Sequence, residues 1–459
     1  MPLILPSNSI SAGGYEVDNS LRFDDGSSDY LSRTPASAGN RKTMTYSFWL
    51  KKTTNNYYFY FFSTGNAGAV PRSVFGFSLD KLYIAFNPTG SSWNEIFTNA
   101  LFRDVSAWYH VVVAIDTTQS TASNRTKIYV NGEQITSFSS ASYVSQNTDL
   151  PNNNSSIPHF IGKNTATGTE YYDGYMAEVC FIDGQQLDPT SFGEFDADTG
   201  IWKPIDVSGL TFGTNGFYLD FENSGSLGAD VSGNGNNFTV NNLTSIDQTT
   251  DTPTNNYATG NVLIPSTLTY SDGNLTIQRT TTNWESTGST IAVTQGKWYA
   301  EFKWISGTFA MIGVEDMELV STWDNEFMGQ TANGRGYGWD GNVRNNGSSS
   351  SYGASYSTGD IIGVALDMDN KFVYMSKNGT FQNSGDPTSG ATGTGGLSLS
   401  GTEYIIGWSA YNSVISANFG NPPFTISSGN SDGNGYGNFE YSVPENYYSL
   451  NVKNLAEFG

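Results

Sequence analysis

The sequence predicts an all-β fold of antiparallel sandwiches, and three observations support this prediction. Short runs of β-branched and aromatic residues recur along the 459 residues, separated by Gly, Asn, Asp and Ser. Helical periodicity is almost absent, so no helices connect these runs as they would in a parallel sheet. The composition includes 51 Gly, 28 Phe, 27 Tyr and 10 Trp, which supplies both turns and core material.

The expected strands follow one another along the chain. Those in the first half are Thr45–Leu50, Tyr57–Phe62, Trp108–Ile115 and Lys127–Val130. Those in the second half are Trp298–Trp304, Ile361–Leu366 and Phe372–Met375. One short helical segment is expected at 188–192, because Asp188 can cap it and Pro189 suits the first helical position.

Composition divides the chain into two large parts and a distinct middle. We expect an N-terminal arm at 1–14, a first domain at 15–204, an ordered Asn/Thr-rich connector at 205–260 and a second domain at 261–459. The connector contains strand-like runs at Phe217–Phe221 and Phe238–Val240. The apolar arm can either dock on a partner subunit or fray.

A weak internal repeat links the two large parts. Each contains an apolar strand that ends in Asp, a polar turn, a second strand with a central Tyr, and Asn-Gly. The copies end at Gly132 and Gly379. Because Asn-Gly readily adopts positive φ angles, a tight turn is expected after each second strand. The repeat predicts two sandwiches of one general architecture.

The first part resembles the laminin-G-like, or concanavalin A-like, jelly-roll domains. The matching segments are Leu21–Ser32, Tyr46–Lys52, Trp108–Gly132 and Tyr171–Gly193. The second part resembles an SPRY domain, which is another concanavalin A-like sandwich. Its matching segments are Gly296–Trp304, Gly359–Gly379 and Ala417–Phe424, and Phe439–Leu455 resembles a closing strand of such domains. The resemblance implies two concanavalin A-like antiparallel jelly-roll sandwiches in tandem.

The tandem resembles virion proteins of marine tailed phages. This resemblance implies a virion-surface protein, such as a tail fibre, appendage or capsid fibre, that assembles with other virion proteins. An elongated two-domain subunit with a free N-terminal arm suggests a homo-oligomer. The resemblance also implies binding of host-surface glycans or proteins through loops at the sandwich tips. A purely structural capsid-decorating or fibre-building subunit remains the alternative, and a polysaccharide-degrading enzyme is a third.

The charge pattern excludes several classes of partner. A formal net charge of −22 disfavours nucleic acid and anionic lipid as partners.

No apolar run reaches the length of a membrane span, and the N-terminus lacks the basic residue of a secretory signal. The single cysteine, Cys180, excludes an intrachain disulfide and is expected to be buried.

One loop has the donor spacing of a calcium site. Oxygen-bearing side chains alternate at Asp230, Ser232, Asn234 and Asn236, with a glycine for the turn. Position twelve is Asn241 rather than Glu, and no helices flank the loop. The laminin-G-like resemblance implies Ca²⁺ at such loops, and an Asx turn is the alternative. A second acidic cluster consists of Asp24, Asp25 and Asp29, for which a solvated turn is expected.

Sugar binding is expected where aromatic and amide side chains share a loop. The candidates for stacking on a sugar ring are Trp93, Tyr337 and Trp339. Asp340 beside them is expected to accept hydrogen bonds from the sugar hydroxyl groups. Weaker candidates are 323–325 and 408–412. The alternative is that these aromatic residues plug the sandwich ends.

The sequence gives little support for a catalytic function. A glycosidase needs two carboxyl groups facing one sugar, and Glu315 and Glu318 would face opposite sides of a strand. His110 lies within an expected strand, where a structural role is expected rather than that of a base. A non-enzymatic protein is therefore predicted.

Overall fold

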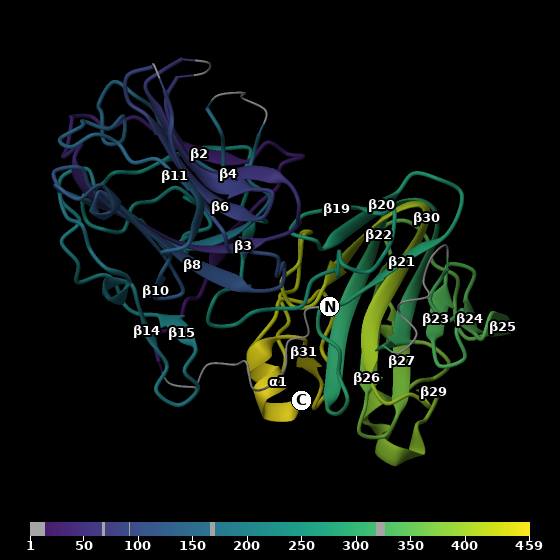
Figure 1. Cartoon of the computed structure of the whole chain (residues 1–459). Coiled ribbons are helices and arrows are strands. Elements are labelled where there is room, and N and C mark those ends of the chain that lie inside the picture. The colour runs from purple at the N-terminus through teal and green to yellow at the C-terminus, as the bar shows by residue number, and fades with distance from the viewer. Residues whose placement is uncertain (1–13, 67–68, 91, 166–169, 318–325) are drawn as a thin grey trace. The chain divides into compact units, whose positions relative to one another are not determined.

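The computed structural model describes residues 14–66, 69–90, 92–165, 170–317 and 326–459. The chain is all-β and divides into two compact units, shown in Figure 1. We call 14–254 the first sandwich and Asn255–Gly459 the second sandwich. Each has its own hydrophobic core. The predicted arm lies outside the described residues except for Gly14.

The first sandwich packs two antiparallel sheets face to face. In spatial order, one sheet contains β10 (Glu133–Gln134), β9 (Thr126–Val130), β8 (Trp108–Asp116), β3 (Thr43–Lys52), β13 (Gly174–Asp183), β1 (Ser20–Phe23) and β18 (Gln248–Thr249), with β16 (Phe217–Leu219) beside β13. The other contains β11 (Phe138–Ala141), β7 (Asn94–Thr98), β6 (Lys81–Asn87), β5 (Arg72–Ser78), β4 (Tyr58–Thr64), β12 (His159–Ile161), β2 (Tyr30–Arg33) and β17 (Thr239–Asn241). A small hairpin is formed by β14 (Gly193–Phe195) and β15 (Trp202–Pro204).

Alternation along the strands builds the core between these sheets. Tyr46 and Phe48 of β3 face Phe62 and Phe75 of the opposite sheet, with ring centroids 4.6 Å apart for Tyr46 and Phe62 and 5.3 Å apart for Tyr46 and Phe75. Because successive side chains of a strand point to opposite faces, every second residue enters the core.

The segment predicted as a connector forms part of the first sandwich. Its runs at β16, β17 and β18 pair with β13, β2 and β1. Asp251 accepts a 2.7 Å hydrogen bond from Lys51 of β3, and both side chains are buried. The domain boundary predicted at residue 204 therefore differs from the structure, in which the first unit extends to Thr254.

The second sandwich is organised around two long strands, β22 (Lys297–Asp316) and β30 (Tyr404–Asn418), which pair along most of their length. The register shifts between Trp304 and Ser306, where β22 bends. The other strands are β19 (Thr269–Ser271), β20 (Thr276–Arg279), β21 (Glu285–Gly288), β23 (Arg335–Gly338), β24 (Asn342–Asn345), β25 (Ser348–Ser351), β26 (Ile361–Asp367), β27 (Phe372–Lys377), β28 (Thr380–Phe381), β29 (Leu397–Ser398) and β31 (Tyr448–Ser449).

The repeated hairpins form as predicted. β8 pairs with β9 in the first sandwich, and β26 pairs with β27 in the second. Asn131 and Gly132 have φ angles of 49° and 81°, and Asn378 and Gly379 have 47° and 79°. Both Asn-Gly pairs therefore make the tight turn that reverses the chain into the next short strand.

Helical structure is short. Asp188 caps the 3-10 turn η3 (Pro189–Ser191) as predicted, accepting a bond from the Thr190 N–H. Two further 3-10 turns are η2 (Ala122–Asn124) and η5 (Pro387–Thr392). The segment 439–455, expected to be a closing strand, supplies only β31 and then enters helix α1 (Val452–Phe458), which Asn451 caps.

Two buried glutamates should make the second sandwich more stable in mild acid. Burial raises the pKa of Glu301 and of Glu315 to about 7 each, against 4.5 without burial. A raised folded-state pKa stabilises the fold at low pH, and this contribution is lost as pH rises through about 7. We expect the urea midpoint of the second sandwich to be higher at pH 5.5 than at pH 8, and Glu301→Gln to reduce that difference. A midpoint that rises with pH would contradict this.

Candidate ligand-binding site

Five aromatic side chains form a cluster on the outer face of the second sandwich. We call Trp284, Phe309, Phe327, Trp339 and Tyr411 the aromatic platform. Phe309 of β22 lies directly opposite Tyr411 of β30, while their neighbours Ala310 and Ala410 point into the core. Period-two alternation therefore places both rings outside. Trp284 immediately precedes β21, and Trp339 immediately follows β23.

The rings of the platform contact one another and remain partly exposed. The Phe309 and Trp339 rings stack with centroids 4.1 Å apart. The Trp284 ring lies 5.6 Å from that of Trp339, 5.5 Å from that of Tyr411 and 5.8 Å from that of Phe327. All five side chains have intermediate exposure. Together the five rings form one continuous apolar surface that is partly open to solvent.

Polar groups border the platform. The Arg344 guanidinium donates to the Asp340 carboxylate at 2.7 Å and lies 5.9 Å from the Trp339 ring centroid. Burial acts to raise the pKa of Asp340, but hydrogen bonds from Arg344 and Asn342 outweigh it, and the pKa is lowered. Asn412, which is exposed beside Tyr411, donates to Thr308. Apolar rings with a few charged and amide groups at the edge are typical of small-ligand sites.

The structure separates the predicted binding residues of this region. Trp339 and Asp340 lie at the platform and its edge. Tyr337, predicted to stack on a sugar, is fully buried, and its hydroxyl donates to the Ala354 carbonyl. It faces the core, where its ring centroid lies 5.4 Å from that of Tyr352 and 5.1 Å from that of Tyr356, so this prediction is wrong. Trp408 is also buried, and 323–325 lies outside the described residues.

Trp93 lies on the first sandwich, immediately before β7. It is partly exposed, and its ring packs against the Arg72 guanidinium, with 4.7 Å from the Arg72 Cζ to the ring centroid. Tyr83 and Phe97 belong to the same small cluster. Trp93 is therefore available at a surface, on a different domain from the platform.

The side chains of the predicted calcium loop are engaged within the protein. The Asp230 carboxylate accepts from the backbone N–H groups of Tyr218, Ser232 and Asn236 at 3.0, 2.9 and 2.7 Å. The Asn234 amide donates to two backbone carbonyls. The Asn236 amide does the same, and its oxygen accepts from Arg33. The positive charge of the Arg33 guanidinium would repel a calcium ion bound by these oxygen atoms. These contacts therefore favour the Asx-turn alternative. Calcium binding stays a prediction.

Replacing Asp230 tests the two alternatives. Because the carboxylate holds three backbone N–H groups, we expect Asp230→Ala to lower the free energy of unfolding of the first sandwich by about 1–3 kcal/mol. The loss should be the same in millimolar CaCl₂ and in EDTA, measured by thermal melting. A loss seen only in calcium would restore the metal site.

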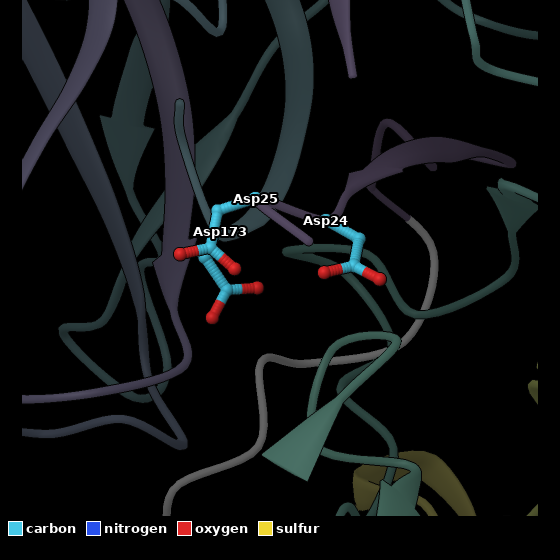
Figure 2. A group of neighbouring side chains, drawn as sticks. All are labelled: Asp24, Asp25 and Asp173. Atoms are coloured by element: carbon cyan, nitrogen blue, oxygen red, sulfur yellow. The ribbon is translucent and has the colours of Figure 1, made fainter. Parts of the chain in front are cut away.

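A second acidic group is assembled by the fold rather than by one loop. Oxygen atoms of Asp24, Asp25 and Asp173 lie within 4.8 Å of one another, as Figure 2 shows. Asp24 and Asp25 follow β1, and Asp173 precedes β13, which is the antiparallel neighbour of β1. Asp29, the third member of the predicted cluster, instead accepts from the Asp24 N–H. Carboxylates are hard donors, but surface acidic groups occur commonly without a metal.

Both histidines have structural roles. His110 is fully buried and bridges Ser47 Oγ at 2.8 Å and Trp202 Nε1 at 2.9 Å, and burial lowers its pKa to about 3. His159 is buried likewise and accepts from the Asn153 N–H. Cys180 is buried, as predicted, and burial raises its pKa. These groups lack the exposure that a base or nucleophile needs.

Comparison with known proteins identifies two domains in tandem. Residues 25–186 match the model described as the concanavalin A-like lectin/glucanases superfamily, and 297–421 match the SPRY domain. The chain thus carries a concanavalin A-like domain followed by an SPRY domain. Curated proteins give no significant match. Across the described residues, no helix has the length and apolarity needed to cross a membrane.

Three solved structures are similar to this chain at low sequence identity. The SPRY domain of human HERC1 is 16% identical, with a TM-score of 0.27, covering 34% of this chain and 96% of its own. Domains LG4–5 of the mouse laminin alpha1 chain are 11% identical, with a TM-score of 0.31, covering 88% and 86%. A candidate carbohydrate binding protein from Bacteroides ovatus is 17% identical, with a TM-score of 0.34, covering 50% and 59%.

Proposed function

We propose that this chain is a non-enzymatic, lectin-like protein of a tailed-phage virion surface that binds host-surface glycans through the aromatic platform. The observation that carries the proposal is the platform itself. The C–H faces of sugar rings pack on aromatic rings, and hydroxyl groups hydrogen-bond to polar side chains at the edge. Trp284, Trp339 and Tyr411 supply the rings, and Asp340 and Asn412 supply polar groups.

The domain organisation supports binding rather than catalysis. The concanavalin A-like match belongs to a superfamily of lectins and glucanases, and laminin G-like and SPRY domains are mostly binding modules. The virion assignment is supported by the resemblance of the tandem to tailed-phage virion proteins. On this proposal the chain assembles as a homo-oligomer with other virion proteins, and the platform faces the host.

A glycan array with the full chain tests the binding function. We expect binding of at least one class of neutral glycan. Trp284→Ala and Trp339→Ala should each weaken binding about tenfold or more, as removal of a central aromatic anchor does. Phe195→Ala is the matched control, because Phe195 is 51% exposed on the first sandwich. A blank array, or unchanged affinity in both tryptophan variants, would favour the purely structural subunit instead.

The location requires a separate measurement. Cryo-EM of intact virions should show this chain at a tail, fibre or capsid surface with the platform facing outward. Density with the platform buried against a neighbouring virion protein would contradict host recognition, and absence from the particle would contradict the virion assignment.

A further inference from the structure

Arg72 and Lys163 of the first sandwich lie against aromatic rings on one sheet face. In the part of the chain that the structure describes, neither Arg72 nor Lys163 forms an ion pair. The Nε of Arg72 is buried there without a hydrogen-bond partner.

Aromatic rings hold both cations in place. The Arg72 guanidinium lies 4.7 Å from the Trp93 ring centroid. The Lys163 ammonium lies 4.1 Å from the Tyr30 centroid, 5.4 Å from that of Tyr171 and 5.7 Å from that of Phe160. Cation–π contacts fix a cation without neutralising its charge, so both remain able to pair with an anion.

These residues lie on the outer face of the sheet that contains β2, β12, β4, β5, β6 and β7. Leu31 and Ile161 enter the core, so their neighbours Tyr30 and Phe160 point outward. We call Tyr30, Arg72, Trp93, Phe160, Lys163 and Tyr171 the cationic aromatic face.

Rings of β4, β6 and β7 add to the aromatic surface of this face. Tyr83 of β6 lies 6.4 Å from Tyr60 of β4 and stacks on Phe97 of β7 at 4.4 Å, measured between centroids. From β2 to β7 the strands span about 24 Å at their usual spacing. The face is therefore long enough for several sugar units in a row.

Two acidic side chains share this face and limit what can bind. Glu95 accepts a 2.7 Å hydrogen bond from the Tyr83 hydroxyl, and Glu170 accepts from the Asn164 amide. Burial raises the pKa of Tyr60 to about 12, with Glu170 and Glu95 acting in the same direction and Arg72 against them, so these charges lie near one another. A densely charged polyanion such as nucleic acid would be repelled, whereas widely spaced anionic groups between sugar rings would fit.

We propose that the cationic aromatic face binds an acidic polysaccharide, whose carboxylate or sulfate groups pair with Arg72 and Lys163 while its sugar rings pack on Trp93 and Tyr30. The planar guanidinium of Arg72 can bind a carboxylate or sulfate through two parallel hydrogen bonds. This inference rests on the proposed function only in taking a glycan as the ligand, and it concerns the other domain.

The test measures binding of the full chain to polymers of defined charge. Hyaluronate supplies one carboxylate per two sugar units, κ-carrageenan supplies one sulfate per two sugar units, dextran is neutral, and single-stranded DNA carries a phosphate on every nucleotide. We expect tighter binding to one or both acidic polysaccharides than to dextran or DNA, and weakening as salt rises. Arg72→Gln and Lys163→Gln should each weaken it about five- to tenfold. Lys127→Gln, a cation removed from the opposite sheet, should change it less than about twofold.

Several results would overturn the proposal. These are no binding to either acidic polysaccharide, equal or tighter binding to DNA, or unchanged affinity in both Arg72→Gln and Lys163→Gln. Thermal melting establishes whether each variant is folded. If Arg72→Gln does not fold, Lys163→Gln tests the proposal by itself. The neutral-glycan array reports on the platform and this assay on Arg72 and Lys163, so either can fail while the other succeeds.

Discussion

Replacing Asp80 by alanine is expected to lower the free energy of unfolding of the first sandwich by about 3–5 kcal/mol. The Asp80 carboxylate is fully buried and accepts from the Lys52 ammonium at 3.0 Å, from the Asn56 N–H at 2.9 Å and from Arg103 at 3.2 Å. Lys52 is only 1% exposed. Removing Asp80 leaves a buried cation without its counter-charge and breaks the hydrogen bonds to Asn56 and Arg103.

Urea denaturation of Asp80→Ala measures this loss. Asp149→Ala is the control, because it removes an ion pair of similar type between Asp149 and Lys42, which are 58% and 38% exposed. Exposed pairs contribute little, so the control should lose no more than about 1 kcal/mol. Equal losses in the two variants would contradict the stabilising role given to the buried pair.

A chain cut after Thr254 should fold its first sandwich, and a chain cut after Pro204 should not. The shorter chain lacks β16, β17 and β18, which complete both sheets. It also loses Asp251, the buried carboxylate that accepts a hydrogen bond from the Lys51 ammonium, at a cost of about 3–5 kcal/mol. Domains of this kind are stable by only about 5–15 kcal/mol, so these losses together remove the folded state.

Circular dichroism with thermal melting distinguishes the two truncated chains. The chain ending at Thr254 should show a cooperative transition, and the chain ending at Pro204 should show none. In the full chain, Asp251→Ala should lower the melting temperature of the first sandwich. Cooperative folding of the shorter chain would restore the boundary predicted from the sequence.

Local sequence signals predicted most of the fold. Strands such as β3, β8 and β26 are long enough for their β-branched and aromatic composition to predict them. Asn-Gly at 131–132 and 378–379 predicted the positions of two tight turns. The domain to which the segment after residue 204 belongs was harder to predict. Its strands are three residues long or less, and polar residues separate them. Pairing with distant strands, rather than local composition, stabilises them.

The candidate site was only partly predictable, because tertiary contacts build it. Trp339 and Asp340 belong to one loop rich in aromatic and polar residues, which gave a local signal. Trp284 and Phe309 carried no such signal, and β21, β22 and β30 bring their rings together. Tyr337 shows the opposite case, since the loop composition that singled it out does not reveal which side of β23 faces the core.

A crystal structure of the full chain with a glycan taken from the array tests the central claim most directly. The account predicts a sugar ring packed against Trp339 or Trp284, with a hydroxyl group bonded to Asp340, Arg344 or Asn412. A glycan bound elsewhere on the second sandwich, with the aromatic platform bare, would contradict it.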